Sequence, residues 1–145
     1  MGDACLDAAG GYCDHPKFGW HIQFPDWVRA LTLRHFHILV REGTEDKLIT
    51  INVLEFLTEI INYAAMTEFL QQNPGFARHS FPTLLNWTDN MTARSWVRKA
   101  ALMSLIAKSL QRILCAMMIN NPLGLWADWL EGRKNITADN ISRMY

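Results

Sequence analysis

The chain has 145 residues, of which 50% are hydrophobic and 19% are charged. This length and composition predict one globular domain spanning residues 1–145 and exclude a disordered chain. Lysine plus arginine and aspartate plus glutamate number 14 each. The net charge therefore does not mark a nucleic-acid-binding protein, and any phosphate-binding surface would be a local patch.

The first predicted elements are short strands followed by a helix. Residues 1–13 contain small residues and the pair Gly10–Gly11, which is typical of a turn. Residues 18–25 alternate in a manner typical of a strand, so we expect a meander of two or three strands ending at Pro25–Asp26. Apolar residues at roughly helical spacing predict a helix over 26–40, and a charged, glycine-containing loop follows at 41–48.

Helices and strands alternate in the rest of the chain. A wide apolar face predicts a long helix over 51–72, with Asn52 as its candidate N-cap. The remaining expected elements are a strand at 81–87, helices at 91–99 and 101–118, a strand at 125–130, a polar loop at 131–135 and a terminal helix at 136–145. Strands that precede a helix–strand–helix–helix–strand–helix succession predict an α/β domain whose mixed sheet is covered by helices.

Cysteine usage and the N-terminal residues bear on the compartment. The 3 cysteines lack framework spacing, which favours free thiols in a reducing environment. The N-terminal MGDACLDAAGG has neither the basic start nor the apolar stretch of a signal peptide. The longest apolar segment, residues 100–119, contains lysine, glutamine and arginine and is too polar to span a bilayer. We therefore expect an intracellular protein, in the cytoplasm or nucleus, without a membrane partner.

The stretch LLNWTDN, residues 84–90, ends a predicted strand on a carboxylate. One interpretation is that Asp89 caps the following helix, because aspartate and asparagine satisfy free backbone N–H groups there. The other is that Asp89 holds a metal ion at the carboxyl edge of a sheet, where open α/β sheets bind their ligands.

Three further acids stand out by their position at the ends of predicted elements. Asp3 lies in the first strand, Glu55 near the start of the long helix and Asp139 near the start of the last helix. If the fold brings these three acids and Asp89 together, their negative charges would repel one another unless cations neutralised them. Oxygen ligands suit Mg²⁺ or Mn²⁺, and two such ions about 3.5–4 Å apart can drive phosphodiester hydrolysis.

Each of these acids also has a structural explanation. Asp3 would belong to a frayed N-terminus. Glu55 shares a polar stripe with Glu59 and Asn62 and would be solvated, and Asp139 would favour the helix dipole. Spacing alone does not choose between the explanations.

Four sequence blocks together resemble a known family. GDACLDAAGGY, INVLEF, LLNWTDNMTA and ADWLEGRKNITADNISR occur in the order and at about the distances of a ribonuclease H domain. The resemblance is to the domains that follow the reverse transcriptase in retroelements, particularly those of the tyrosine-recombinase type and their eukaryotic relatives. It covers nearly the whole chain, from Asp3 to Arg143.

The resemblance implies a fold and an activity. The fold would be ribonuclease H-like, a five-stranded mixed sheet flanked by helices, with its first three strands antiparallel and its N-terminal strand truncated. The chain would hydrolyse the RNA strand of RNA–DNA hybrids with two Mg²⁺ ions, for which Mn²⁺ can substitute, leaving a 3′-hydroxyl and a 5′-phosphate. Asp3 and Asp89 would bridge the ions, Glu55 would hold the ion at the leaving oxygen and Asp139 the ion at the attacking water.

The resemblance also implies how the substrate is bound. Asn52, Asn90 and Thr92 lie beside the acids and would meet the RNA 2′-hydroxyls. Arg94, followed by Arg98 and Lys99, would contact DNA phosphates, or these residues form a solvated helix face. Trp87 and Trp96 are expected in the core. The partners would be the hybrid and an upstream reverse transcriptase domain.

Other functions remain open. The loop EGRKN has no histidine, which many cellular members place near the last carboxylate, and the segment 26–50 is longer than in cellular enzymes. The main alternative is a non-catalytic ribonuclease H-like remnant or scaffold domain. A DNA-cutting transposase or integrase is a third alternative, although those enzymes typically use three acids.

Overall fold

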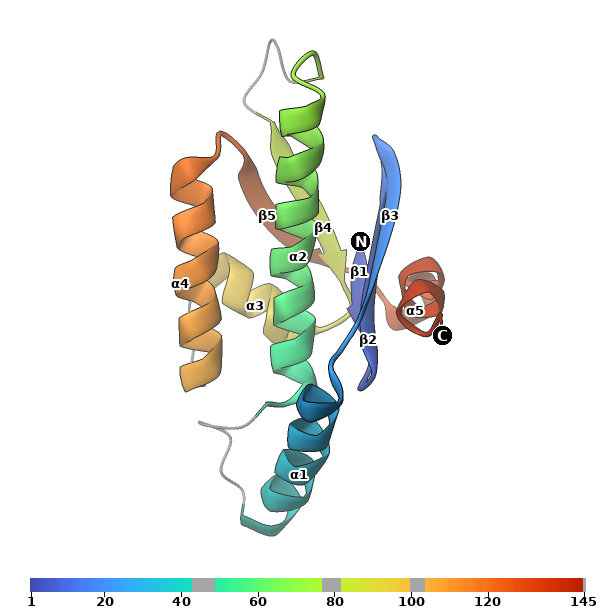
Figure 1. Ribbon diagram of the computed structural model, residues 1–145, viewed down its shortest axis with the longest axis vertical. Coiled ribbons are helices and arrows are strands. Elements are labelled where there is room, and N and C mark those ends of the chain that lie inside the picture. Colours follow the sequence, from blue (N-terminus) through green and yellow to red (C-terminus); the bar gives the residue numbers. More distant parts are fainter. Residues whose placement is uncertain (43–48, 77–81, 100–103, 145) are drawn as a thin grey trace.

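A computed structural model describes residues 1–42, 49–76, 82–99 and 104–144. Figure 1 shows the elements in chain order: β1 (Gly2–Ala4), β2 (Ala8–Asp14), β3 (Lys17–Gln23), α1 (Asp26–Glu42), α2 (Ile51–Gln72), β4 (Thr83–Thr88), α3 (Met91–Lys99), α4 (Leu105–Asn120), β5 (Gly124–Trp129), the 3-10 helix η1 (Gly132–Lys134) and α5 (Ile136–Ser142). The predicted α/β class is confirmed. Each predicted helix and strand has a counterpart, but two helices, α1 and α2, precede β4 where the predicted succession has one. Of the predicted segments, 43–48, position 81, 101–103 and position 145 lie outside the described residues.

The first three strands form an antiparallel meander, as expected. Asp3 pairs with Gly10, and Gly11 pairs with Trp20. The prediction of a turn at Gly10–Gly11 is wrong, because both glycines lie inside β2. A Cβ atom on Gly10 would lie 2.7 Å from the backbone N of Ser142. The glycine therefore lets α5 pack directly on β2.

The remaining two strands form a separate parallel pair in which Leu85 lies opposite Trp126. Strand β1 contacts β4, but no ladder joins the two sheets within the described residues, so the predicted five-stranded mixed sheet is not shown. On the edge of β1 that faces away from β2, side chains form hydrogen bonds with the backbone. The Ala4 amide donates to Glu55 Oε1 at 3.3 Å, and the Gly2 carbonyl accepts from Asn135 Nδ2 at 3.3 Å.

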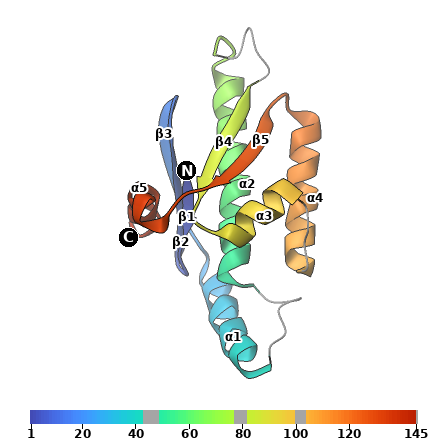
Figure 2. The same ribbon diagram turned by 180° about the vertical axis from the view of Figure 1, so that it is seen from behind.

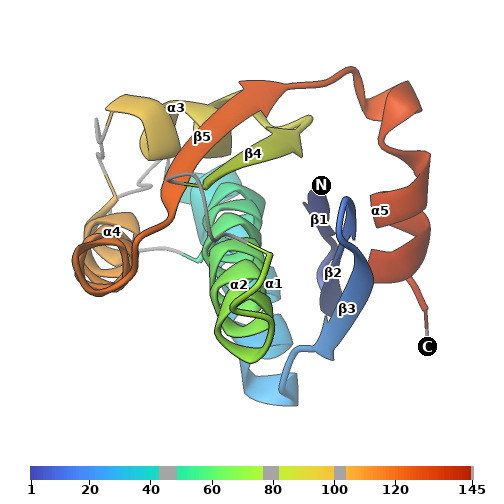
Figure 3. The same cartoon turned by 90° about the horizontal axis from the view of Figure 1, so that it is seen from above.

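Helices cover the two faces of the meander. Helix α2 packs on β1, β2 and β4, and α5 packs on β1, β2 and β3. Figure 3 shows α2 and α5 on opposite sides of this sheet, and Figure 2 shows β4 and β5 from behind, with α3 beside them. Strand β1 is therefore enclosed by α2, α5, β2 and β4, which places its side chains at the meeting point of both sheets.

The larger hydrophobic core lies between α2, α3 and α4. Phe56 and Tyr63 of α2 are fully buried there, together with Leu114 of α4. Trp96 packs edge-on against Phe56, with ring centroids 5.6 Å apart, which confirms its predicted core position. Trp87, the other tryptophan predicted to be buried, is half-buried.

No helix in the described part of the chain is both long enough and apolar enough to cross a membrane.

Candidate metal centre

Three of the four predicted acids meet at the end of β1. Asp3 lies in β1, Glu55 in the second turn of α2 and Asp89 directly after β4. Each offers a carboxylate oxygen within 4.8 Å of the others. Asp3 and Glu55 are only 6% and 5% exposed, and Asp89 is half-buried. Contacts of β1 with both α2 and β4 produce this convergence.

The polar stripe of α2 faces the protein interior. Glu55, Glu59 and Asn62 are 5%, 0% and 6% exposed, so the interpretation that Glu55 is solvated is wrong. Glu59 accepts a hydrogen bond from Asn86 Nδ2. Asn62 accepts from Trp20 Nε1 at 2.7 Å and donates to Asn86 Oδ1 at 3.2 Å. The stripe is buried because it fills the seam between the meander and β4.

The environment of the acids opposes their ionisation. Burial, followed by the charges of Asp3 and Asp89, raises the pKa of Glu55 to about 9. Burial also raises the pKa of Asp3, and the charges of Asp89 and Asp139 add to that rise. Glu55 Oε2 is buried without a hydrogen-bond partner among the described residues. A bound cation would satisfy this oxygen and neutralise the repulsion.

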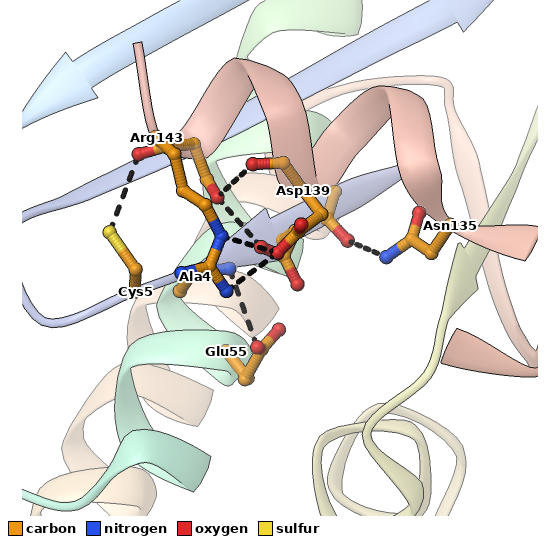
Figure 4. Close-up of polar contacts among 9 residues, drawn as sticks. Ala4, Cys5, Glu55, Asn135, Asp139 and Arg143 are labelled. Atoms are coloured by element: carbon orange, nitrogen blue, oxygen red, sulfur yellow. Dashed lines mark hydrogen bonds and ion pairs between the residues drawn. The ribbon is translucent and has the colours of Figure 1, made fainter. Parts of the chain in front are cut away.

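The fourth predicted acid is engaged differently. Asp139 in α5 is not one of the three acids that meet within 4.8 Å. Its Oδ1 accepts from both Nε and Nη2 of Arg143, each at 2.7 Å. It is nevertheless close, because Ser142 Oγ lies 2.7 Å from Asp3 Oδ2 and 2.9 Å from the Asp139 carbonyl oxygen. Figure 4 shows Arg143 turned toward Asp139, and Glu55 reaching the Ala4 amide from α2.

The helix cap after β4 is Asn90. Its Oδ1 accepts from the Ala93 backbone N–H at 2.9 Å, the bond expected of an N-cap side chain. Its amide also donates to Asn52 Oδ1 at 2.9 Å. The prediction that Asn52 is the N-cap of α2 is wrong, because Thr50 holds that position. With Asn90 as the cap, the carboxylate of Asp89 remains available to the acid cluster.

Some of the other residues predicted to bind substrate already contact side chains of the protein. Arg94 Nη2 lies 3.0 Å from Asp128 Oδ1, and Arg98 lies over the Trp126 ring, 4.0 Å from its centroid. The Trp129 backbone N–H, and after it Arg94, lower the pKa of Asp128. Thr92 is half-buried in α3. The predicted phosphate contact of Arg94 would thus require exchange with Asp128.

Sequence reasoning missed Gly132, Ser142 and Arg143, which surround the acids. The blocks EGRKN and ISR contain them, but neither block indicates which carboxylate each residue approaches. A Cβ on Gly132 would lie 2.9 Å from Asp89 Oδ2. The backbone of η1 therefore lies directly against the Asp89 carboxylate.

Gly132→Ala is expected to weaken Mn²⁺ binding by roughly 10–100-fold, the range found when a ligand's supporting contacts are lost. The added methyl group must displace either η1 or the Asp89 carboxylate. Calorimetric titration with Mn²⁺ measures the change. Gly75→Ala is the matched control, because a Cβ at Gly75 has no neighbour within 4 Å. Equal Mn²⁺ affinity in both variants would contradict the prediction.

Comparison with known proteins identifies no relative: the chain matches no family model, no curated protein and no solved structure.

Proposed function

We propose that this chain is a ribonuclease H-like domain that cleaves the RNA strand of RNA–DNA hybrids during retroelement reverse transcription. One observation carries the proposal: Asp3, Glu55 and Asp89 come from three of the four blocks that resemble this family, and their carboxylates converge within 4.8 Å. These acids are distant from one another in the sequence, and their convergence supports the proposal.

The proposed fold is the five-stranded mixed sheet of that family. Contact between β1 and β4 supports it, because pairing there would join the two observed sheets in the order β3-β2-β1-β4-β5. Glu55 and Asn135, the residue before α5, bond the Ala4 amide and the Gly2 carbonyl on this edge of β1, so pairing with β4 would require these two bonds to be exchanged.

The three acids that meet suit Mg²⁺, and the proposed pair of ions would also require Asp139. The donors are carboxylate oxygens, which hard cations prefer. Glu55 Oε2 is buried and unpartnered among the described residues, so it supplies a ligand atom that nothing else in the cluster uses. Asp3, Glu55, Asp89 and Asp139 would hold the ions, and Mn²⁺ is the expected substitute.

The chain's own groups would position the hybrid at these ions. Bound Mg²⁺ supplies an activated water and stabilises the leaving oxygen. The paired amides of Asn52 and Asn90 lie directly beside Asp89 and present polar groups suited to RNA 2′-hydroxyls. Thr92 and Arg94 of α3 would extend the contact along the backbone of the hybrid.

The test is cleavage of a labelled RNA–DNA hybrid with and without Mg²⁺. The expected result is Mg²⁺-dependent cutting of the RNA strand that leaves a 3′-hydroxyl, with duplex DNA and duplex RNA intact. Intact hybrid in the presence of folded protein would favour the alternative, a non-catalytic remnant or scaffold domain.

A further inference from the structure

Arg143 pairs with Asp139, the one predicted acid that is not part of the Asp3–Glu55–Asp89 cluster. Two of its nitrogens, Nε and Nη2, contact the same oxygen of Asp139, each at 2.7 Å. Asp139 lies in α5 and Arg143 is the residue at the C-cap of this helix, so the pair forms between residues one turn apart in the chain. Figure 4 shows the Arg143 guanidinium beside the Asp139 carboxylate.

Arg143 is connected to the cluster through the residue before it. Ser142 bonds Asp3 Oδ2 at 2.7 Å, while Arg143 pairs with Asp139. Two neighbouring residues therefore contact Asp3 and Asp139, the two acids that would hold the same ion.

We propose that Arg143 is a positioning residue that occupies Asp139 as a built-in counter-ion, so that the two metal ions bind in a fixed order. Asp3, Glu55 and Asp89, whose oxygens already meet within 4.8 Å, would hold the first ion. Asp139 would hold the second ion after it releases Arg143. This inference rests on the proposed function, because it concerns the same metal centre.

The exchange is easy because the pair is exposed. The side chains of Arg143 and Asp139 are 58% and 43% exposed, and exposed ion pairs are weak. Removing Arg143 should therefore tighten the second site by at most about fivefold. The first site should change much less, since solvent screens Arg143 from the buried Asp3–Glu55–Asp89 group.

The experiment counts bound Mn²⁺ in the full chain from the electron paramagnetic resonance signal of free Mn²⁺. Wild type is compared with Arg143→Gln, Asp139→Asn and the double variant. Arg29→Gln is the matched control, because Arg29 also pairs with an acid and its side chain is 56% exposed. Thermal melting confirms that each variant is folded.

Four results are expected together. Wild type binds one ion tightly and one weakly, Arg143→Gln tightens the weak ion, and Asp139→Asn removes it. In the Asp139→Asn background, Arg143→Gln has no further effect, because the partner it released is gone. A tightening that persists in that background would overturn the proposal, since the arginine would then act by its general field. An unchanged weak site in Arg143→Gln would also overturn it.

Failure of the metal centre itself looks different. If wild type binds no Mn²⁺, both the centre and the order of binding are refuted. If wild type binds Mn²⁺ and Arg143→Gln matches Arg29→Gln, the proposed centre stands and only the role of Arg143 is refuted.

Discussion

Asp89→Asn is expected to reduce Mg²⁺-dependent hybrid cleavage by at least about a hundredfold, the scale seen when one charge-stabilising group is removed from an active site. The substitution keeps the shape of the side chain and removes its charge from the group formed with Asp3 and Glu55. The same variant should lose the rise in melting temperature that Mg²⁺ causes, because a ligand stabilises only the folded state that binds it.

The melting temperature of the metal-free protein distinguishes a metal ligand from a structural residue. Asp89 repels Asp3 and Glu55, and its charge contributes to the raised pKa values of both. Removing it should leave the metal-free melting temperature unchanged or slightly higher, while cleavage and the Mg²⁺ shift are lost. Asp14→Asn is the control, since Asp14 is exposed at the far end of β2. A variant that loses cleavage and also melts at a lower temperature than wild type in the absence of Mg²⁺ would indicate a structural role for Asp89 instead.

The sequence was sufficient for the element order and for the acids at element ends. Hydrophobic periodicity predicts the range of α2 correctly, but its N-cap is Thr50 and not Asn52. Asp89 stands out in the sequence because it directly follows a predicted strand. Those signals are local, and they depend on the spacing of neighbours along the chain.

Burial and pairing across the fold could not be predicted in the same way. The stripe of Glu55, Glu59 and Asn62 has the spacing of a solvated helix face, and only the packing of β1 and β4 on α2 buries it. Gly10 and Gly11 have the composition of a turn, and only tertiary packing explains them within a strand. Helix α5 lies against Gly10, and the side chains of Asn62 and Trp20 lie against Gly11. The Arg143–Asp139 pair has the spacing of an ordinary surface pair, and its meaning comes from Asp3, which is distant in sequence.

Glu59→Gln is expected to stabilise the protein by about 2–3 kcal/mol at pH 8 and to have little effect near pH 4. Glu59 is fully buried, and burial raises its pKa from 4.5 to about 7, although the N-terminal ammonium and Asn86 oppose the rise. The folded state therefore holds the Glu59 proton more tightly than the unfolded state does. Stability from this group is complete below about pH 4.5 and is lost as the pH rises through about 7.

The size of the effect follows from the shift. A rise from 4.5 to about 7 corresponds to roughly 3 kcal/mol, and the unpaired amide that glutamine introduces takes back up to about 1 kcal/mol. Urea unfolding at pH 4, 6 and 8 measures the difference between variant and wild type. Because Glu55 and the Met1 ammonium also have shifted pKa values, only this difference isolates Glu59.

Glu68→Gln is the matched control, because Glu68 lies on the same helix and is exposed, with Gln72 as its hydrogen-bond partner at 2.6 Å. Its unfolding free energy should follow wild type at every pH. If Glu59→Gln lowers the unfolding free energy equally at pH 4 and pH 8, the carboxylate is stabilised by its bond to Asn86, and burial does not oppose its ionisation. A gain in unfolding free energy confined to alkaline pH would mean that this buried acid lowers the stability of the fold. A purely structural residue on α2 would not lower it.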